Sequence, residues 1–331
     1  MQGIVRSVHS QFVLIVGLTI GAPLDAQVHL RAHAPPGRLI NVGHRKLHLY
    51  CSGNGTPTVV LVAGNGGYSI DWALVQPRIA VVTRVCSYDR AGYAWSDPGP
   101  ADETVEQTIP DLRNLLHAAG ERPPYLLVGA SIGGIFIRAY QRSFPNDVAG
   151  LIFTNSSNRV GRSVNGNISL IWDLTEDEIR STFPLRESAK GSIPTHQGEP
   201  FDRLPPTLQT LRLWLDVSHW KTWEPSNQRS DLILSWRSEF LREFEETKVG
   251  KEPPLGKLPV VVLSSDPIPS EAERQSRDGA AARLDVLSSN TVHITATGSG
   301  QEIHLYQPEI LVQALARCVA AIRSNTSLPI E

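Results

Sequence analysis

The chain has no marked excess of either charge and no long apolar run, and each shortage argues against a class of protein. Its 31 lysines and arginines nearly balance 33 aspartates and glutamates, which leaves a formal net charge of −2. We therefore expect no basic face, and neither nucleic acid nor a polyanionic substrate is favoured as a partner. The apolar run near the N-terminus, Phe12–Ile20, is too short to span a bilayer.

Cysteines are also scarce, with three in the whole chain. Their spacing resembles no metal-binding pattern, so we expect no metal site. Cys51 and Cys86 both lie in segments with strand patterns and could be neighbours, whereas Cys318 lies in a helical pattern that favours a buried thiol.

The N-terminus has the pattern of a secretory signal peptide. Arg6 supplies a short positive region, the apolar run follows, and small or turn-forming residues continue to Ala26. This order predicts that residues 1–26 are removed and that the mature protein begins near Gln27. We expect a secreted or periplasmic protein with no membrane contact after cleavage. The alternatives are an uncleaved anchor or a buried N-terminal segment.

The rest of the chain alternates buried-strand patterns with helical spacing. The segments with a strand pattern are KLHLYC (46–51), TVVLVAG (58–64), RVCSYD (84–89), YLLVGAS (125–131), VAGLIFTN (148–155), LPVVVLSSD (258–266) and TVHITATG (291–298). Helical spacing appears in residues 104–120 and again from residue 132 to about residue 143. This alternation predicts an α/β fold with a mostly parallel sheet, covered by helices on both faces.

One segment interrupts the alternation. Residues 158–252 contain several helix-like patterns and no run of the buried-strand type. We interpret this segment as a helical cap inserted between two parts of the α/β core, residues 27–157 and 253–331. Five of the seven tryptophans lie in the predicted cap, where they either pack its helices or line an apolar pocket beneath it.

The strongest functional signal is VGASIGG. Gly129, Ser131 and Gly133 form G-x-S-x-G directly after a buried strand and directly before a helix. In this setting the glycines permit a sharp turn that exposes the serine hydroxyl at the edge of the sheet. We therefore predict that Ser131 is a nucleophile; a purely structural turn is the alternative.

A second glycine-rich turn, AGNGG at residues 63–67, follows an earlier strand. Acyl transfer needs backbone N–H donors directed at the developing oxyanion. In this architecture the donors come from the residue after the nucleophile and from the loop after the early strand. We expect Ile132 and Asn65 to supply them, unless the turn is an ordinary glycine turn.

Several segments resemble one family: LHLYCSGNGTPTVVLVAGNGG, DWALVQPRIA, TRVCSYDRAGYAWSDPGP and PYLLVGASIGGIFIRAY. They are similar to the exported branch of the α/β-hydrolase superfamily, over about residues 45–155 and again over about residues 258–321. The resemblance implies a serine esterase, lipase or peptidase-like hydrolase without a metal or an organic cofactor. It also implies a disulfide between Cys51 and Cys86.

The chain departs from this family at the positions of the catalytic acid and base. One strand that ends in aspartate in relatives ends here in Asn155, which leaves Asp266 as the candidate triad acid. Relatives carry a motif like GSGHxIxLxQP whose histidine is the base, and that position is Gln301 here. Glutamine cannot accept the proton of a serine hydroxyl near neutral pH. His304, three residues later, is the nearest replacement.

These observations support two hypotheses. In the first, an exported hydrolase cleaves a carboxylic ester or a similar small acyl substrate through Ser131, with His304 as base and Asp266 orienting it. In the second, the protein is catalytically impaired and binds an apolar small molecule. A third possibility for the base is another histidine, such as His196 or His219 in the cap; His293, on the last strand, fits a structural role better.

Overall fold

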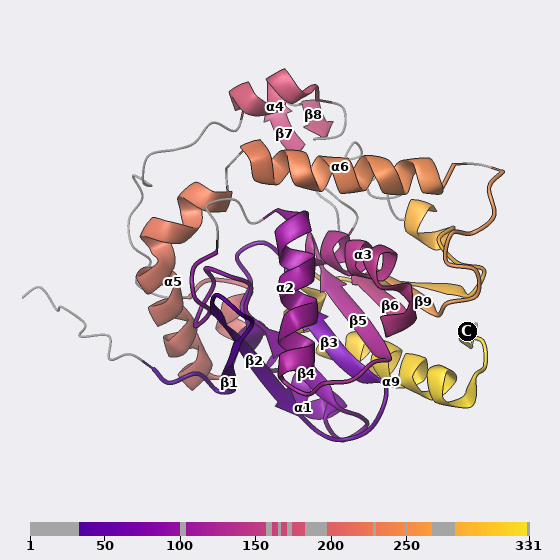
Figure 1. The fold of residues 1–331 in the computed structure, drawn as a ribbon, viewed down its shortest axis with the longest axis horizontal. Helices are drawn as coiled ribbons and strands as arrows, with labels where there is room; N and C mark the ends of the chain where they lie inside the picture. Colours follow the sequence, from indigo (N-terminus) through magenta and orange to yellow (C-terminus); the bar gives the residue numbers. More distant parts are fainter. Residues whose placement is uncertain are drawn as a thin grey trace, which may run out of the picture. The chain divides into compact units, whose positions relative to one another are not determined.

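A computed structural model describes residues 33–99, 104–156, 161–164, 167–170, 174–182, 197–227, 230–248, 250–266 and 282–329. Its main feature is an eight-stranded sheet with the order β1-β2-β4-β3-β5-β6-β9-β10 (Figure 1). The strands are β1 (Arg38–Asn41), β2 (Lys46–Ser52), β3 (Thr58–Val62), β4 (Val85–Tyr88), β5 (Tyr125–Ala130), β6 (Val148–Thr154), β9 (Val260–Asp266) and β10 (Thr291–Thr297). Only β1/β2 and β2/β4 pair antiparallel; the other neighbours are parallel.

Helices cover both faces of this sheet, as the alternating pattern predicted. They are α1 (Gln76–Ile79), α2 (Val105–Ala118), α3 (Gly133–Ser143), α8 (Ile303–Tyr306) and α9 (Pro308–Ser324), with short 3₁₀ turns η1 (Ser69–Trp72) and η2 (Pro145–Asp147). Side chains of α2 and α3 join one apolar cluster, and those of α1 and α9 join the other. The predicted α/β fold, with a mostly parallel sheet flanked by helices, is confirmed.

Strand β3 shows why the central strands read as continuous apolar runs. Val60 and Val62 point into the cluster under α2 and α3, whereas Val59 and Leu61 point into the cluster under α9. All four side chains are fully buried. Burial stabilises each of these side chains by about 1.5–3 kcal/mol, so a strand between two helical layers favours apolar residues on both of its faces.

The chain between β6 and β9 forms mostly helices: α4 (Glu176–Thr182), η3 (Phe201–Arg203), α5 (Pro206–Asn227) and α6 (Ser230–Glu246). It also contains an antiparallel pair, β7 (Gly161–Val164) with β8 (Asn167–Leu170), which the helix-like patterns did not indicate. No described helix of the chain is long and apolar enough to cross a membrane.

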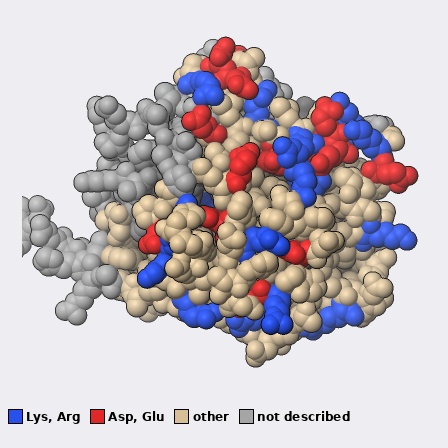
Figure 2. Space-filling model, viewed as in Figure 1, with Lys and Arg blue, Asp and Glu red and all other residues tan. Residues whose placement is uncertain are grey.

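Helix α6 packs against α3, the helix that follows Ser131 (Figure 1). Arg142 of α3 donates to Glu239 and Glu246 of α6, and Arg138 donates to Glu246 as well. Side chains of both signs gather over α6 in Figure 2. These largely buried ion pairs of opposite sign join α6 to α3.

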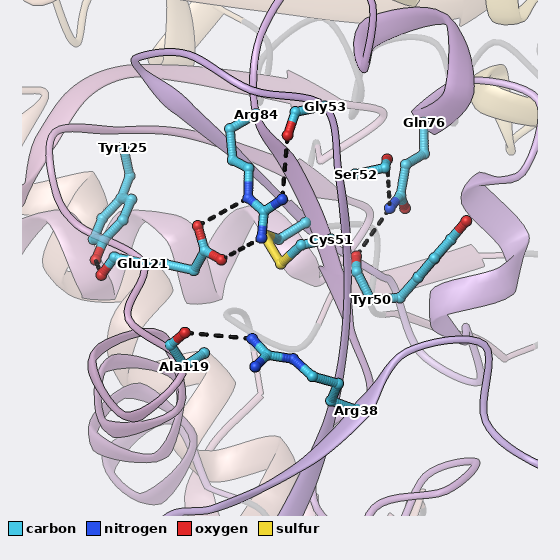
Figure 3. Close-up of a disulfide and its surroundings, with 11 residues drawn as sticks. Arg38, Tyr50, Cys51, Ser52, Gly53, Gln76, Arg84, Ala119, Glu121 and Tyr125 are labelled. Carbon is cyan, nitrogen blue, oxygen red and sulfur yellow. Dashed lines mark hydrogen bonds and ion pairs between the residues drawn. A yellow bond between two sulfur atoms is a disulfide. The ribbon is translucent and has the colours of Figure 1, made fainter.

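The disulfide implied by the family resemblance is present between Cys51 of β2 and Cys86 of β4, which are cross-strand partners (Figure 3). Beside it, Arg84 makes a two-bond ion pair with Glu121. Cys318 is a buried free thiol on α9, as its helical pattern predicted, and burial raises its pKa to about 12. The predicted signal peptide, residues 1–26, lies outside the described residues.

Candidate active site

Ser131 lies at the turn between β5 and α3, in a backbone conformation that few residues adopt. Its φ is 51°, in the left-handed region that non-glycine residues disfavour. The Ser131 N–H donates to the Thr154 carbonyl at 3.0 Å, and the Ser131 carbonyl accepts the Gly134 N–H at 3.0 Å. These bonds hold a strained turn in place, the geometry expected of an exposed nucleophile.

The glycines around Ser131 allow backbone to approach backbone. A methyl group on Gly129 would lie 2.5 Å from the carbonyl carbon and oxygen of Gly133. One on Gly134 would collide with the side chain of Ser156, whose hydroxyl donates to the Gly129 carbonyl at 2.8 Å. A methyl group on Gly133 would collide with the Val62 carbonyl oxygen, so both glycines of the G-x-S-x-G pattern are required by space as well as by the turn.

A cavity of about 70 Å³ opens at this turn. Its walls bring together four of the residues singled out from the sequence: Asn65, Ser131, Gln301 and His304. These residues come from three distant parts of the chain, at the ends of β3, β5 and β10. The carboxyl ends of neighbouring parallel strands meet at one edge of a sheet, which explains why they converge.

Gln301, at the position of the base in the resembling family, is hydrogen-bonded to Asn155 through its backbone. The Asn155 side-chain amide donates to the Gln301 backbone carbonyl and to the Ser265 hydroxyl, each at 2.7 Å, and its oxygen accepts the Ser265 N–H at 2.8 Å. Asn155 itself has a φ of 45°. The two neutral residues that replace an expected acid and base are therefore neighbours in space, across a separation of 146 residues.

His304 lies in the cavity wall but is deeply buried. It is 6% exposed, and its ring lies 4.5 Å from the Trp72 ring, centroid to centroid. Burial, assisted by the charge of Arg212, lowers the pKa of His304 to about 3. Its Nδ1 has no hydrogen-bond partner, and no hydrogen bond joins His304 to Ser131 in the described part of the chain. The imidazole is therefore neutral near pH 7.

Asp266, the predicted acid, ends β9 and does not line this cavity. Among the described residues it makes no hydrogen bond with His304, so the structure does not bring the predicted acid and base together. The residues that follow Asp266 are not described. Its role as the acid stays a prediction.

The remaining histidines differ in placement. His196 and the side chain of His219 lie outside the described residues. His293 of β10 bonds Ser264 through Nε2 at 2.9 Å and Asp285 through Nδ1 at 3.1 Å. Ser264 is 5% exposed in the middle of a paired strand. This second Ser–His–Asp chain of contacts therefore lacks the exposed nucleophile that catalysis needs.

Three charged groups at the cavity were not anticipated. Asp71 lines it, and burial raises the pKa of Asp71 to about 6 although Arg212 of α5 opposes this shift at 3.4 Å. Glu302 also lines it, and burial raises its pKa. Asp71 stands in a segment that resembles the family, so its proximity could have been suspected. No local pattern marks Arg212, which reaches the site only because α5 folds over the turn after β3.

Comparison with known proteins agrees with this architecture. The family model described as alpha/beta hydrolase fold matches residues 57–187. A thermophilic esterase from Thermogutta terrifontis superposes with a TM-score of 0.61 at 19% identity, over 86% of this chain and 97% of the esterase. A likeness at this identity establishes the fold.

Two curated proteins are similar to this chain in sequence. The chain is 29% identical over 148 residues to the probable transporter efuK of Hormonema carpetanum, which is 42% of this chain and only 20% of that protein. It is 24% identical over 280 residues to the uncharacterized protein YqjL of Bacillus subtilis (strain 168), covering 84% and 87% of the two chains. With the strand order and the matched family model, these findings establish that the chain has the α/β-hydrolase fold.

Proposed function

We propose that this protein is an exported serine hydrolase that cleaves a carboxylic ester or a similar small acyl substrate. The observation that carries the proposal is the strained backbone of Ser131 at the wall of a small cavity. The backbone of a non-glycine residue at φ 51° is strained, and strained residues of this kind cluster in active sites. The esterase neighbour supports the same reaction class.

In this mechanism the Ser131 hydroxyl attacks the acyl carbonyl as His304 accepts its proton. The backbone N–H groups of Asn65 and Ile132 stabilise the oxyanion, and the proton passes from His304 to the leaving group. The acyl-enzyme is then hydrolysed by water. Asp266 has the role of orienting the imidazole in this mechanism.

The environment of His304 makes it a weak base. With a pKa of about 3, its imidazole is unprotonated at neutral pH, which is the form that a general base needs. Compared with an unperturbed histidine, the protonated form is disfavoured by roughly 5 kcal/mol. We therefore expect turnover far slower than that of a hydrolase with an intact triad, for which loss of the base costs about a million-fold.

Export is part of the proposal. The N-terminal pattern supports it, and so does the disulfide between Cys51 and Cys86. Structural disulfides persist in oxidising compartments and are rare in the cytosol. A secreted or periplasmic location accounts for both features.

A second candidate is a protein that binds a small apolar molecule without turning it over. The residue types at Asn155 and Gln301 favour it, because two positions that carry ionisable side chains in the resembling family are both neutral amides here. The strained turn at Ser131 argues for catalysis, since simple binding has no need of an exposed nucleophile.

Labelling with a fluorophosphonate probe separates the two candidates, because the probe reacts with a serine activated by a base. Wild type is compared with Ser131→Ala and with His304→Phe, which keeps an aromatic ring against Trp72. Ser264→Ala is the control for the contact between the buried Ser264 of β9 and His293 of β10.

Labelling of wild type and of Ser264→Ala, lost in Ser131→Ala and in His304→Phe, supports the serine hydrolase with His304 as base. Labelling that survives in His304→Phe assigns the base to another residue. If wild type does not react but Gln301→His does, the protein is a hydrolase frame without its base, and the binding function is favoured.

A further inference from the structure

The turn that follows β3 lies directly against the nucleophile. The Gly64 carbonyl accepts the Gly67 N–H at 3.2 Å, and Gly66 has a φ of 68°, so residues 64–67 form a tight turn with Asn65 at its second position. A methyl group on Gly64 would lie 3.1 Å from the Cβ of Ser131. The peptide bond between Gly64 and Asn65 is therefore within reach of an acyl group on that serine.

A buried arginine, Arg90, hydrogen-bonds the carbonyl oxygen of this peptide. Arg90, which follows β4 and is 4% exposed, donates through Nη1 to the Ala63 carbonyl at 2.8 Å and through Nη2 to the Gly64 carbonyl at 3.0 Å. Its guanidinium also lies over the rings of Tyr93 and Phe136, 4.4 and 5.3 Å from their centroids. Two bonds from one rigid planar group fix the orientation of two successive peptides.

The orientation of the Gly64 carbonyl determines that of the next N–H. The bond between Gly64 and Asn65 is not among the cis peptides, and in a planar trans peptide the C=O and the N–H point in opposite directions. Because the carbonyl is directed at Arg90, the Asn65 N–H is directed away from it. Neither this N–H nor that of Ile132 donates a hydrogen bond to another described residue, so both stay available.

We propose that Arg90 is a positioning residue for the oxyanion hole: it holds the Gly64 carbonyl so that the Asn65 N–H faces the acyl group on Ser131. This inference rests on the proposed function. The opposing view is that Arg90 only satisfies two buried carbonyl oxygens. Arg323, which is exposed and does not line the cavity, offers a comparison, because it also donates to two backbone carbonyls, those of Thr56 and Val82, at 2.7 and 3.0 Å.

The test compares Arg90→Lys with Arg323→Lys in the full chain. Lysine keeps the charge but lacks the planar fork, so each variant loses two-point support of its carbonyls. We measure the rate of fluorophosphonate labelling of Ser131 and the affinity for ethylboronic acid, which forms a tetrahedral adduct on a reactive serine. Removing one oxyanion donor typically costs 10²–10³ in rate, so a misdirected donor should lower both quantities by about 10- to 100-fold in Arg90→Lys. Arg323→Lys should leave both unchanged.

A second measurement does not depend on reactivity. The ¹⁵N order parameter of the Asn65 amide should be near 0.85 in wild type and in Arg323→Lys, about the value of rigid backbone, and below about 0.6 in Arg90→Lys. If that amide stays rigid in Arg90→Lys, or if labelling falls no more than in Arg323→Lys, the inference is wrong. If wild-type Ser131 neither labels nor binds the boronic acid, the proposed function fails, and the order parameter alone decides the role of Arg90.

Discussion

Replacing His304 with phenylalanine tests the physical basis of the proposed site. The imidazole is 6% exposed and stacked on Trp72, and burial is the main reason that its pKa is lowered to about 3. In the unfolded chain the same histidine has a pKa of about 6.5. As the pH falls from about 6.5 toward 3, His304 therefore binds a proton in the unfolded state but stays unprotonated in the folded state.

The sign and size of the effect follow from this difference. Because the pKa of His304 is lower in the folded state, the free energy of unfolding decreases progressively as the pH falls from about 6.5 toward 3. Between about pH 7 and pH 5, proton linkage at His304 alone removes roughly 2 kcal/mol. Phenylalanine keeps the stacking ring but does not ionise, so the wild type should lose about 2 kcal/mol more than His304→Phe over this range. Asp71, with a pKa raised to about 6, acts in the opposite direction but is present in both proteins and cancels.

Urea unfolding of both proteins, followed by far-ultraviolet circular dichroism, measures this difference. Ile303→Val is the control: it removes one buried methyl group beside His304 and should cost about 0.5–1.5 kcal/mol equally at both pH values. Parallel pH profiles for wild type and His304→Phe would refute the reasoning. They would mean that His304 is solvated in solution and that its strength as a base is near normal.

Three further changes test the rest of the architecture. Asn155→Asp combined with Gln301→His restores ionisable side chains at two positions whose residues are hydrogen-bonded neighbours, so fluorophosphonate labelling should be about tenfold or more faster than in either single variant; equal rates would place the base elsewhere. Gly129→Ala drives a methyl group into the turn after Ser131 and should lower the free energy of unfolding by about 1–3 kcal/mol in urea, whereas an unchanged midpoint would contradict the close approach of β5 to α3. Cys51→Ser with Cys86→Ser opens a loop of 35 residues and should cost about 4 kcal/mol on the chain-entropy model, an effect that reduction of the wild type should reproduce.

Local patterns were sufficient wherever a feature depends on neighbouring residues. The strand, turn and helix around Ser131 could be predicted because they are contiguous in the chain; its role as the nucleophile stays a prediction. The apolar runs of β3 and β5 predicted central strands because burial on both faces favours apolar side chains along most of a strand. The pairing of Cys51 with Cys86 came from the family resemblance, since spacing by itself does not specify a partner.

Tertiary structure alone decided which residues of the site contact one another. The contact of Asn155 with Gln301 spans 146 residues, and the bonds from Arg90 to the turn after β3 span 26 and 27. The sequence placed His304 near the expected base, but its low pKa depends on burial and on the charge of Arg212, which no short stretch encodes. A sequence by itself determines which elements form and which side chain is offered at a turn. The distances and the desolvation that set its reactivity arise only when remote segments pack together.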